Sequence, residues 1–244
     1  MDQRIFYSPD DSPAMQIAKQ ELEKRGIHFS EVPTKGVTHL LLPVPCRRDV
    51  SALLKKLSLD VTVLGGALGR EELSGYHKTD LLTDEEYLWK NAMITAHCAM
   101  TVATSVLPVT FTDLPILIIG WGRIGKCLAK LLRGCDAMVT VAARNPKDRA
   151  ALYALGFDAE DTDRLCPHGY RVIFNTVPAP VLSREQLSCC RDDCVKIELA
   201  SSPGLEGDDV IEALGLPGKY APETSGKLIA RTILRLCAGK EHPI

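Results

Sequence analysis

The sequence predicts an α/β protein with two domains, each a parallel sheet flanked by helices. Three observations support this prediction. Short apolar runs alternate with helical stretches, which is typical of parallel sheets with helices on their faces. A glycine-rich turn at residues 120–125 directly follows one of these runs. The alternation is interrupted near Asn91, so we expect a small α/β domain at residues 1–91 and a second domain at residues 92–244.

The first domain is expected to begin with a strand that leads into a helix. Ser12 and Pro13 supply an N-cap and a first-turn proline, and Gly26 ends the helix. The run "TDEE" is a capping box with Thr83 as the cap and Glu86 three residues later, so another helix should begin there. The remaining patterns predict strands at residues 4–8, 38–42 and 61–64 and helices at residues 49–57 and 95–107.

The second domain has the regular βαβ rhythm of a doubly wound sheet. Asn145 and Pro146 form an N-cap with proline at the first helical position, and Ser183 with Gln186 forms a capping box. A C-terminal helix at residues 224–237 is expected to pack back on the domain junction. Strands are expected at residues 116–119, 137–142, 171–176 and 195–200. We expect both domains to be Rossmann-like.

Composition limits the classes of partner. The 244 residues are 45% hydrophobic and 25% charged, which is typical of soluble globular proteins. With 29 basic and 31 acidic residues, the net charge of −2 argues against nucleic-acid or membrane-surface binding. The nine cysteines between Cys46 and Cys237 lack the pattern of a disulfide framework or a zinc site, so we expect thiols and no metal. Because no signal peptide is recognisable, we expect a cytoplasmic protein that binds a small molecule or another protein.

The run "GWGRIG" has the glycine spacing of a dinucleotide-binding turn. The first glycine permits a tight turn, the second lets backbone amides approach a pyrophosphate, and the third lets the following helix pack close to the strand. The helix then directs its positive end at the phosphate. The candidate cofactor-binding residues of the turn are Gly120, Trp121, Gly122, Arg123, Ile124 and Gly125. The alternative is a tight turn in a domain that has lost its ligand.

The end of the next strand, "VAARN", indicates which nucleotide binds. Enzymes that use NAD place an acid about 20 residues after the glycines, where it binds the ribose hydroxyls. Here Ala143 stands near that position and Arg144 follows. A guanidinium binds a 2′-phosphate that a carboxylate would repel, so we expect NADP. Asn145 is a further candidate for the phosphate, with helix capping as the alternative.

Polar runs follow two later strands, at the sheet edge where open α/β proteins bind ligands. In "FNTVPAP", Thr176 and Val177 are expected to face the nicotinamide ribose, with the capping of a strand end as the alternative. The run "ELASSPG" offers a polar turn at the neighbouring strand end. Candidate cofactor-binding residues at this edge are therefore Thr176, Val177, Pro178 and Ala200.

These motifs, together with "NTVPAPVL" and "GLPGKYAPETSGKLIA", resemble the A subunits of dipicolinate synthase in order and spacing from about Thr38 onwards. The resemblance implies an NADP-dependent oxidoreductase that converts dihydrodipicolinate, formed from 4-hydroxy-tetrahydrodipicolinate, to dipicolinate during sporulation. It also implies a partner, the flavoprotein B subunit, together with a homo-oligomer and a location in the cytoplasm of the mother cell.

The sequence departs from this family at several positions. The usual glycine-rich opening strand is absent. In "NAMITAHCA", Asn91 and Thr95 match the interdomain motif of the family, whereas His97 and Cys98 replace an acid and a glycine. In "ELASSPGL", Glu198 stands in place of aspartate and Leu205 in place of a second glycine.

The implied substrate carries two carboxylates. Free amides and hydroxyls at the start of the expected C-terminal helix form a natural carboxylate site, with helix capping as the alternative role of Thr224. Ser201 and Ser202 are expected to meet that site. The candidate substrate-binding residues are Asn91, Thr95, Ser201, Ser202, Thr224 and Ser225.

His97 is the candidate catalytic residue, as a proton relay near neutral pH. The alternative for this histidine is a packed or partnered side chain. Two other functions remain open. One is an NADP oxidoreductase of the shikimate dehydrogenase type, although no convincing N-x-K-G motif of that family is present in the first domain. The other is a protein that binds NADP within a complex without catalysis.

Overall fold

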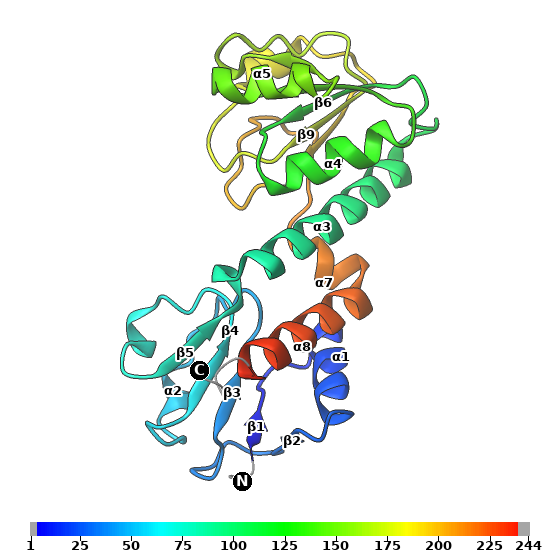
Figure 1. Ribbon diagram of the computed structural model, residues 1–244. Helices are drawn as coiled ribbons and strands as arrows, with labels where there is room; N and C mark the ends of the chain where they lie inside the picture. The colour runs from blue at the N-terminus through cyan, green and yellow to red at the C-terminus, as the bar shows by residue number, and fades with distance from the viewer. Residues whose placement is uncertain (1–3, 239–244) are drawn as a thin grey trace. The chain divides into compact units, whose positions relative to one another are not determined.

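The computed structural model describes residues 4–238, which form two units (Figure 1). The first unit joins residues 4–91 to residues 217–238, and the second unit is residues 92–216. The division expected from the sequence differs, because it assigns everything after Asn91 to the second domain. The outermost parts of the two expected domains, residues 1–3 and 239–244, lie outside the described residues.

The first unit contains a sheet of parallel strands in the order β2-β1-β3-β4-β5. These strands are β1 (Ile5–Tyr7), β2 (His28–Phe29), β3 (His39–Leu41), β4 (Thr62–Gly65) and β5 (His77–Asp80). The three expected strands correspond to β1, β3 and β4. The sequence patterns missed β2 and β5, because these two strands lie at the edges of the sheet and their sequences "HF" and "HKTD" contain no apolar run.

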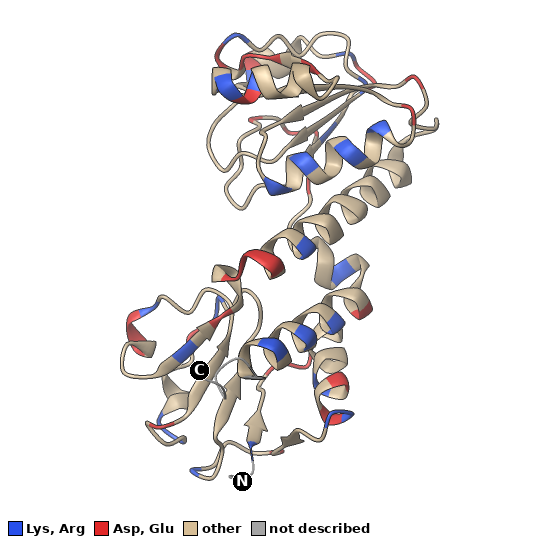
Figure 2. Ribbon diagram, in the orientation of Figure 1, with Lys and Arg blue, Asp and Glu red and all other residues tan. Residues whose placement is uncertain are grey.

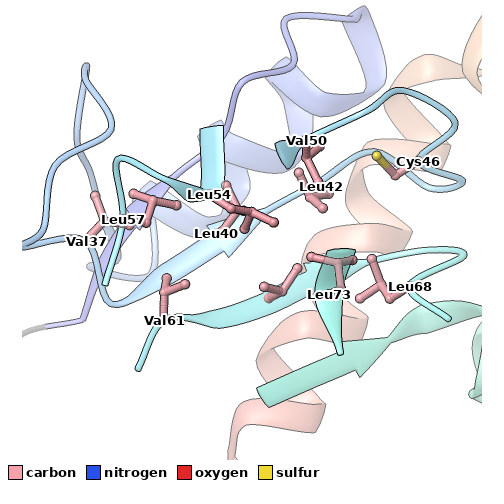
Figure 3. Packing of buried hydrophobic residues seen from close by; sticks show 11 residues of the cluster. Val37, Leu40, Leu42, Cys46, Val50, Leu54, Leu57, Val61, Leu68 and Leu73 are labelled. Carbon is pink, nitrogen blue, oxygen red and sulfur yellow. The ribbon is translucent and has the colours of Figure 1, made fainter. Parts of the chain in front are cut away.

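Aliphatic side chains of β3, β4 and the segments around them form a core of the first unit (Figure 3). The helices and turns of this part are α1 (Pro13–Glu23), α2 (Ser51–Leu54), η1 (Glu71–Leu73) and η2 (Leu81–Thr83). The core cluster is Val37, Leu40, Leu42, Cys46, Val50, Leu54, Leu57, Val61, Val63, Leu68 and Leu73. Helix α1 begins at Pro13 as expected, and the side chain of Ser12 makes no cap bond. The proline at the first position is therefore the start signal.

A single helix, α3 (Glu85–Val106), replaces the two helical stretches expected around Asn91. Its N-cap is Asp84 and not the expected Thr83. The amide of Tyr87 donates to Asp84 Oδ1 at 2.8 Å, whereas the Thr83 hydroxyl donates back to the Asp80 carbonyl at 2.8 Å. Carboxylates cap helices at least as well as threonine hydroxyls, so the cap moves by one residue.

The C-terminal helix α8 (Pro222–Ala238) packs on α1 within the first unit. A Cβ on Gly226 would lie 2.4 Å from the Ala14 carbonyl oxygen and 2.7 Å from Ile17 Cβ, so glycine permits this close approach. Arg235 pairs with Asp84 at 2.5 Å and with Glu86 at 3.1 Å, which holds α8 at the start of α3. The Arg235 guanidinium lowers the pKa of Asp84. Helix α8 therefore packs mainly on α1 and reaches the start of α3 through Arg235, whereas the sequence predicted packing toward the helix after Asn91.

The second unit contains a parallel sheet in the order β11-β10-β9-β6-β7-β8, the order typical of dinucleotide-binding domains. Its strands are β6 (Pro115–Ile119), β7 (Met138–Ala142), β8 (Asp158–Glu160), β9 (Val172–Asn175), β10 (Val195–Glu198) and β11 (Val210–Glu212). Its helices are α4 (Arg123–Arg133), α5 (Pro146–Ala154) and α6 (Arg184–Ser188), with the turn η3 (Thr162–Arg164); α7 (Leu216–Tyr220) lies at the boundary of the units. The predicted capping box of Ser183 and Gln186 is confirmed. Both predicted parallel sheets flanked by helices are therefore present.

Candidate functional site

Gly120 forms the turn at the carboxyl end of β6. Its φ is +105°, a conformation that favours glycine, and its amide donates to the Ala142 carbonyl at 2.9 Å. A Cβ at this position would lie 2.4 Å from Thr176 Oγ1 and 2.8 Å from Val177 Cγ2. The turn therefore sits directly against the end of β9, and no larger residue fits there.

Gly122 and Gly125 have different physical roles. Gly122 is the N-cap residue of α4, with an ordinary φ of −77°, and a Cβ there would meet nothing within 4 Å. A Cβ on Gly125 would lie 2.1 Å from the Gly120 carbonyl oxygen, so this glycine lets α4 pack against the turn. The open position above Gly122 lies at the N-terminus of α4, where the positive end of the helix dipole favours an anion such as a phosphate group.

The electrostatic surroundings of this turn favour an anion. Helix α4 carries Arg123, Lys126, Lys130 and Arg133 and no acidic residue (Figure 2). The half-buried Trp121 ring packs edge-on against Phe157, with centroids 5.9 Å apart, and Lys126 Nζ lies 5.6 Å from its centroid. These contacts hold the indole against the second unit. The positive side chains of α4 add to the attraction that the dipole of this helix exerts on a phosphate.

The turn after β7 presents Arg144 on the surface. Ala143 is buried, whereas Arg144 and Asn145 are exposed. Asn145 Oδ1 accepts the Lys147 amide at 3.0 Å, so the helix-capping role of this asparagine is present. No carboxylate follows β7 at this point, which leaves a position suited to a 2′-phosphate beside Arg144.

Arg149 fixes the shape of this turn, and the sequence patterns gave no reason to select it. Its Nη1 donates to the carbonyls of Ala143 at 2.7 Å and Arg144 at 2.8 Å, and its Nη2 pairs with Asp161 at 2.9 Å. The available signal is a basic residue one helical turn beyond the Asn145 cap. Two of these three contacts are with backbone carbonyls, which any residue supplies, so the sequence gives no sign of them.

The end of β9 is tied to the glycine turn. Both the amide and the hydroxyl of Thr176 donate to the Ile119 carbonyl at 2.9 Å. The buried Asn175 accepts the Val177 amide on Oδ1 at 3.0 Å, so the strand-end role is also present. Thr176 and Val177 are half-buried beside Gly120, and Pro178 is exposed. These residues stand at the carboxyl edge of the sheet, as predicted.

Glu198 organises the end of β10. Its side chain is 1% exposed, and the carboxylate accepts the amides of Ala200 at 2.9 Å, Gly204 at 2.8 Å and Leu205 at 3.2 Å. Asn175 Nδ2 donates to both of its oxygens at 2.9 Å. Ala200 is buried. Ser201 and Ser202 are exposed in the turn that these bonds hold.

The candidate residues on α3 do not share one face. Asn91 and Thr95 are four residues apart and lie on the same side of the helix, with Thr95 buried. His97 is exposed, and its position two residues beyond Thr95 places it about 200° away around the helix axis. Cys98 is buried, and burial raises the pKa of its thiol.

At the carboxylate site expected at residues 224 and 225, the helix begins earlier than the sequence predicted. Helix α8 begins at Pro222, so Thr224 is not its cap. The Ser225 amide donates to the Ala221 carbonyl at 2.9 Å, and the Ser225 side chain is only 6% exposed. Thr224 is exposed in the first turn. Both residues belong to the first unit, whereas Ser201 and Ser202 belong to the second.

Residues 4–238 contain neither a metal-binding cluster nor a membrane-spanning helix. Within this range, no group of three or more histidine, cysteine, aspartate or glutamate side chains is arranged to hold a metal ion. Among the helices of the same residues, none is long and apolar enough to cross a membrane.

The chain is similar to the A subunit of dipicolinate synthase of Bacillus subtilis (strain 168), with 28% identity over 158 residues. The match covers 61% of this chain and 53% of that protein, so it spans about half the length of the relative. No family model matches the chain. The resemblance predicted from the motifs is therefore confirmed by a curated relative.

Solved structures show the same fold. The A subunit of dipicolinate synthase from Bacillus halodurans has a TM-score of 0.83 at 19% identity, covering 96% of this chain and 98% of that chain. D-lactate dehydrogenase from Escherichia coli has a TM-score of 0.62 at 15% identity, with coverage of 98% and 97%. The fold, two parallel sheets flanked by helices, is thus shared with dehydrogenases that are distant in sequence.

Proposed function

We propose that this protein is the A subunit of a dipicolinate synthase, an NADP-dependent oxidoreductase that converts dihydrodipicolinate to dipicolinate. One observation carries the proposal. The position above Gly122 is open at the N-terminus of α4, while Gly120 and Gly125 are packed against their neighbours. This combination fits the pyrophosphate of a dinucleotide at the carboxyl edge of a doubly wound sheet. The likeness to the A subunit of dipicolinate synthase supports the choice of reaction.

Different turns of the second unit bind different parts of the cofactor. The turn at residues 120–125 binds the pyrophosphate, and the turn of Ala143, Arg144 and Asn145 binds the 2′-phosphate. Thr176, Val177, Pro178 and Ala200 contact the nicotinamide half, because the two halves of such a sheet each bind one mononucleotide. When bound, NADP supplies a hydride acceptor.

Arg144→Ala is expected to remove the preference for NADPH over NADH. Loss of a guanidinium that binds a phosphate costs about 1.5 to 3 kcal/mol, or roughly ten- to hundredfold in affinity. NADH affinity should stay within about twofold, because NADH has no 2′-phosphate for the guanidinium to contact. Calorimetric titration of both cofactors measures the change. Arg164→Ala, at an exposed arginine of η3, is the control, and an Arg144→Ala variant that keeps the preference would refute the assignment.

The substrate is a cyclic dicarboxylate, and the protein has to orient it against the cofactor. Its conversion to an aromatic ring releases a hydride and a proton, and aromaticity supplies much of the driving force, so positioning is the main requirement. Among the candidate residues, the exposed Ser201 and Ser202 of the second unit are the proposed polar contacts to the substrate. The exposed imidazole of His97 is the proposed acceptor of the ring proton.

We further propose that the protein works with a flavoprotein B subunit, as a homo-oligomer, in the cytoplasm of the mother cell of a sporulating bacterium. The likeness to a protein named as one subunit of a synthase supports an assembly with another polypeptide.

The test combines the purified protein with the flavoprotein partner, freshly prepared 4-hydroxy-tetrahydrodipicolinate and NADP. We expect pyridine dicarboxylate to accumulate, as measured by its ultraviolet absorbance. Its formation should require both the protein and NADP. Cofactor binding without any product would instead indicate a non-catalytic, NADP-binding role. The altered motif around His97 and Cys98 is the feature that favours this second candidate.

A further inference from the structure

The ends of β9 and β10 are joined through one buried pair of side chains, Asn175 and Glu198. Asn175 is fully buried and Glu198 is 1% exposed. Asn175 Nδ2 lies 2.9 Å from each carboxylate oxygen and donates to the Val177 carbonyl at 3.0 Å, while Oδ1 accepts the Val177 amide at 3.0 Å. The asparagine therefore connects the loop after β9 to the carboxylate at the end of β10.

The donors that reach Glu198 from its own loop are backbone amides. Oε1 accepts the Ala200 amide, and Oε2 accepts those of Gly204 and Leu205. A buried carboxylate is costly unless hydrogen bonds replace its hydration, and bonds to a charged acceptor are stronger than neutral ones. These bonds therefore fix the path of residues 199–205 at both ends, which leaves the exposed Ser201 and Ser202 at the tip.

Gly204 brings the two loops into direct contact. A Cβ there would lie 2.4 Å from the Ala179 carbonyl oxygen and 2.5 Å from Asn175 Nδ2. Its carbonyl accepts the amides of Val181 at 2.8 Å and Leu182 at 3.1 Å. The segments at residues 175–182 and 198–205 thus form one connected structure, which we term the edge platform. Through Thr176 and Val177, the edge platform also touches the glycine turn at Gly120.

We propose that Glu198 is a positioning residue for the nicotinamide half of the bound cofactor, acting through the edge platform. This inference rests on the proposed function. The glycine turn and the turn after β7 lie in the other half of the sheet, which binds the adenosine half of the dinucleotide. The hydrogen bonds of Glu198 join groups of the edge platform itself, so we expect its main effect on the nicotinamide half of the ligand.

The experiment compares the affinities of two ligands, NADP and 2′-phospho-ADP-ribose, which lacks the nicotinamide. Glu198→Gln keeps the size of the side chain but turns an N–H₂ group toward amide donors, so at least one acceptor of the edge platform is lost. We expect NADP affinity to fall about tenfold, while the affinity for 2′-phospho-ADP-ribose stays within about twofold of the unmodified protein. Glu206→Gln, at an exposed carboxylate of the same loop, is the matched control and should change neither affinity.

A second comparison, between NADP and NADPH, distinguishes positioning of the nicotinamide half from electrostatic attraction by the Glu198 carboxylate. The oxidised nicotinamide ring is cationic and the reduced ring is neutral, so loss of a nearby negative charge alone would weaken NADP and spare NADPH. A positioning role predicts equal losses for both. Hydrogen exchange of the amides of Ala200, Gly204 and Leu205 should become faster in Glu198→Gln, because their acceptor is altered.

Several outcomes would overturn the inference. These are equal affinities of the unmodified protein for NADP and 2′-phospho-ADP-ribose, an unchanged ratio of the two in Glu198→Gln, or a loss confined to the oxidised cofactor. If Glu198→Gln does not fold, Gly204→Ala separates the same two loops without altering the carboxylate, and it should show the same loss of NADP alone. Failure of the unmodified protein to bind either ligand would instead refute the proposed function.

Discussion

Gly122→Val is expected to abolish cofactor binding, with a loss of about a hundredfold or more in affinity for NADPH. The open position above Gly122 is the space assigned to the pyrophosphate, and a branched side chain would occupy it. The fold should survive, because Gly122 has a backbone conformation open to any residue and a Cβ there meets nothing within 4 Å. Calorimetry with NADPH measures the affinity, and thermal unfolding checks the fold.

The control for this prediction is Gly134→Val at the other end of α4. Gly134 also has an ordinary φ, of −67°, and a Cβ there would come no closer than 3.3 Å to its nearest neighbour, the Leu131 carbonyl oxygen. NADPH affinity should be unchanged in this variant. A folded Gly122→Val protein that binds NADPH normally would show that the glycine turn has only a structural role.

Gly226→Ala is expected to destabilise the first unit by about 1 to 3 kcal/mol, the usual cost of overpacking. The added methyl group would lie 2.4 Å from the Ala14 carbonyl oxygen and 2.7 Å from Ile17 Cβ, so α8 has to move away from α1. This cost opposes the higher helix propensity of alanine, which is worth about 1 kcal/mol. Denaturant unfolding followed by circular dichroism measures the change in the free energy of unfolding.

Gly218→Ala provides a control with the opposite sign. Gly218 lies in α7, and a Cβ there meets nothing within 4 Å. The substitution should leave stability unchanged or raise it by up to about 1 kcal/mol. If Gly226→Ala is as stable as the unmodified protein, the contact between α1 and α8 does not require glycine.

The sequence patterns predicted the parts of the fold whose signals are local and apolar. Strands β6, β7, β9 and β10 are largely buried, so each is visible as an apolar run. The short edge strands β8 and β11, "DAE" and "VIE", contain acidic residues and were missed. The assignment of α8 to the first unit depends on Gly226 meeting Ala14, a contact between distant parts of the chain that no local pattern contains.

The same distinction applies to the candidate site. The glycine turn was predictable because its steric requirements fall within six residues of the chain, Gly120 to Gly125. Arg149 and Glu198 could not be recognised in these roles, because their partners are mostly backbone amides and carbonyls that any residue supplies. His97 was chosen from its residue type and its place in a motif, and neither indicates which side of α3 it occupies.

Because α8 packs on α1, the first unit is completed only at the end of translation. The second unit, residues 92–216, is an insertion between two stretches of the first. During translation it leaves the ribosome before α8 does, so part of the apolar face of α1, which includes Ala14, Met15 and Ala18, lacks its partner helix at that stage. A nascent polypeptide that stalls before Pro222 therefore contains the whole sheet of the second unit but an incomplete first unit.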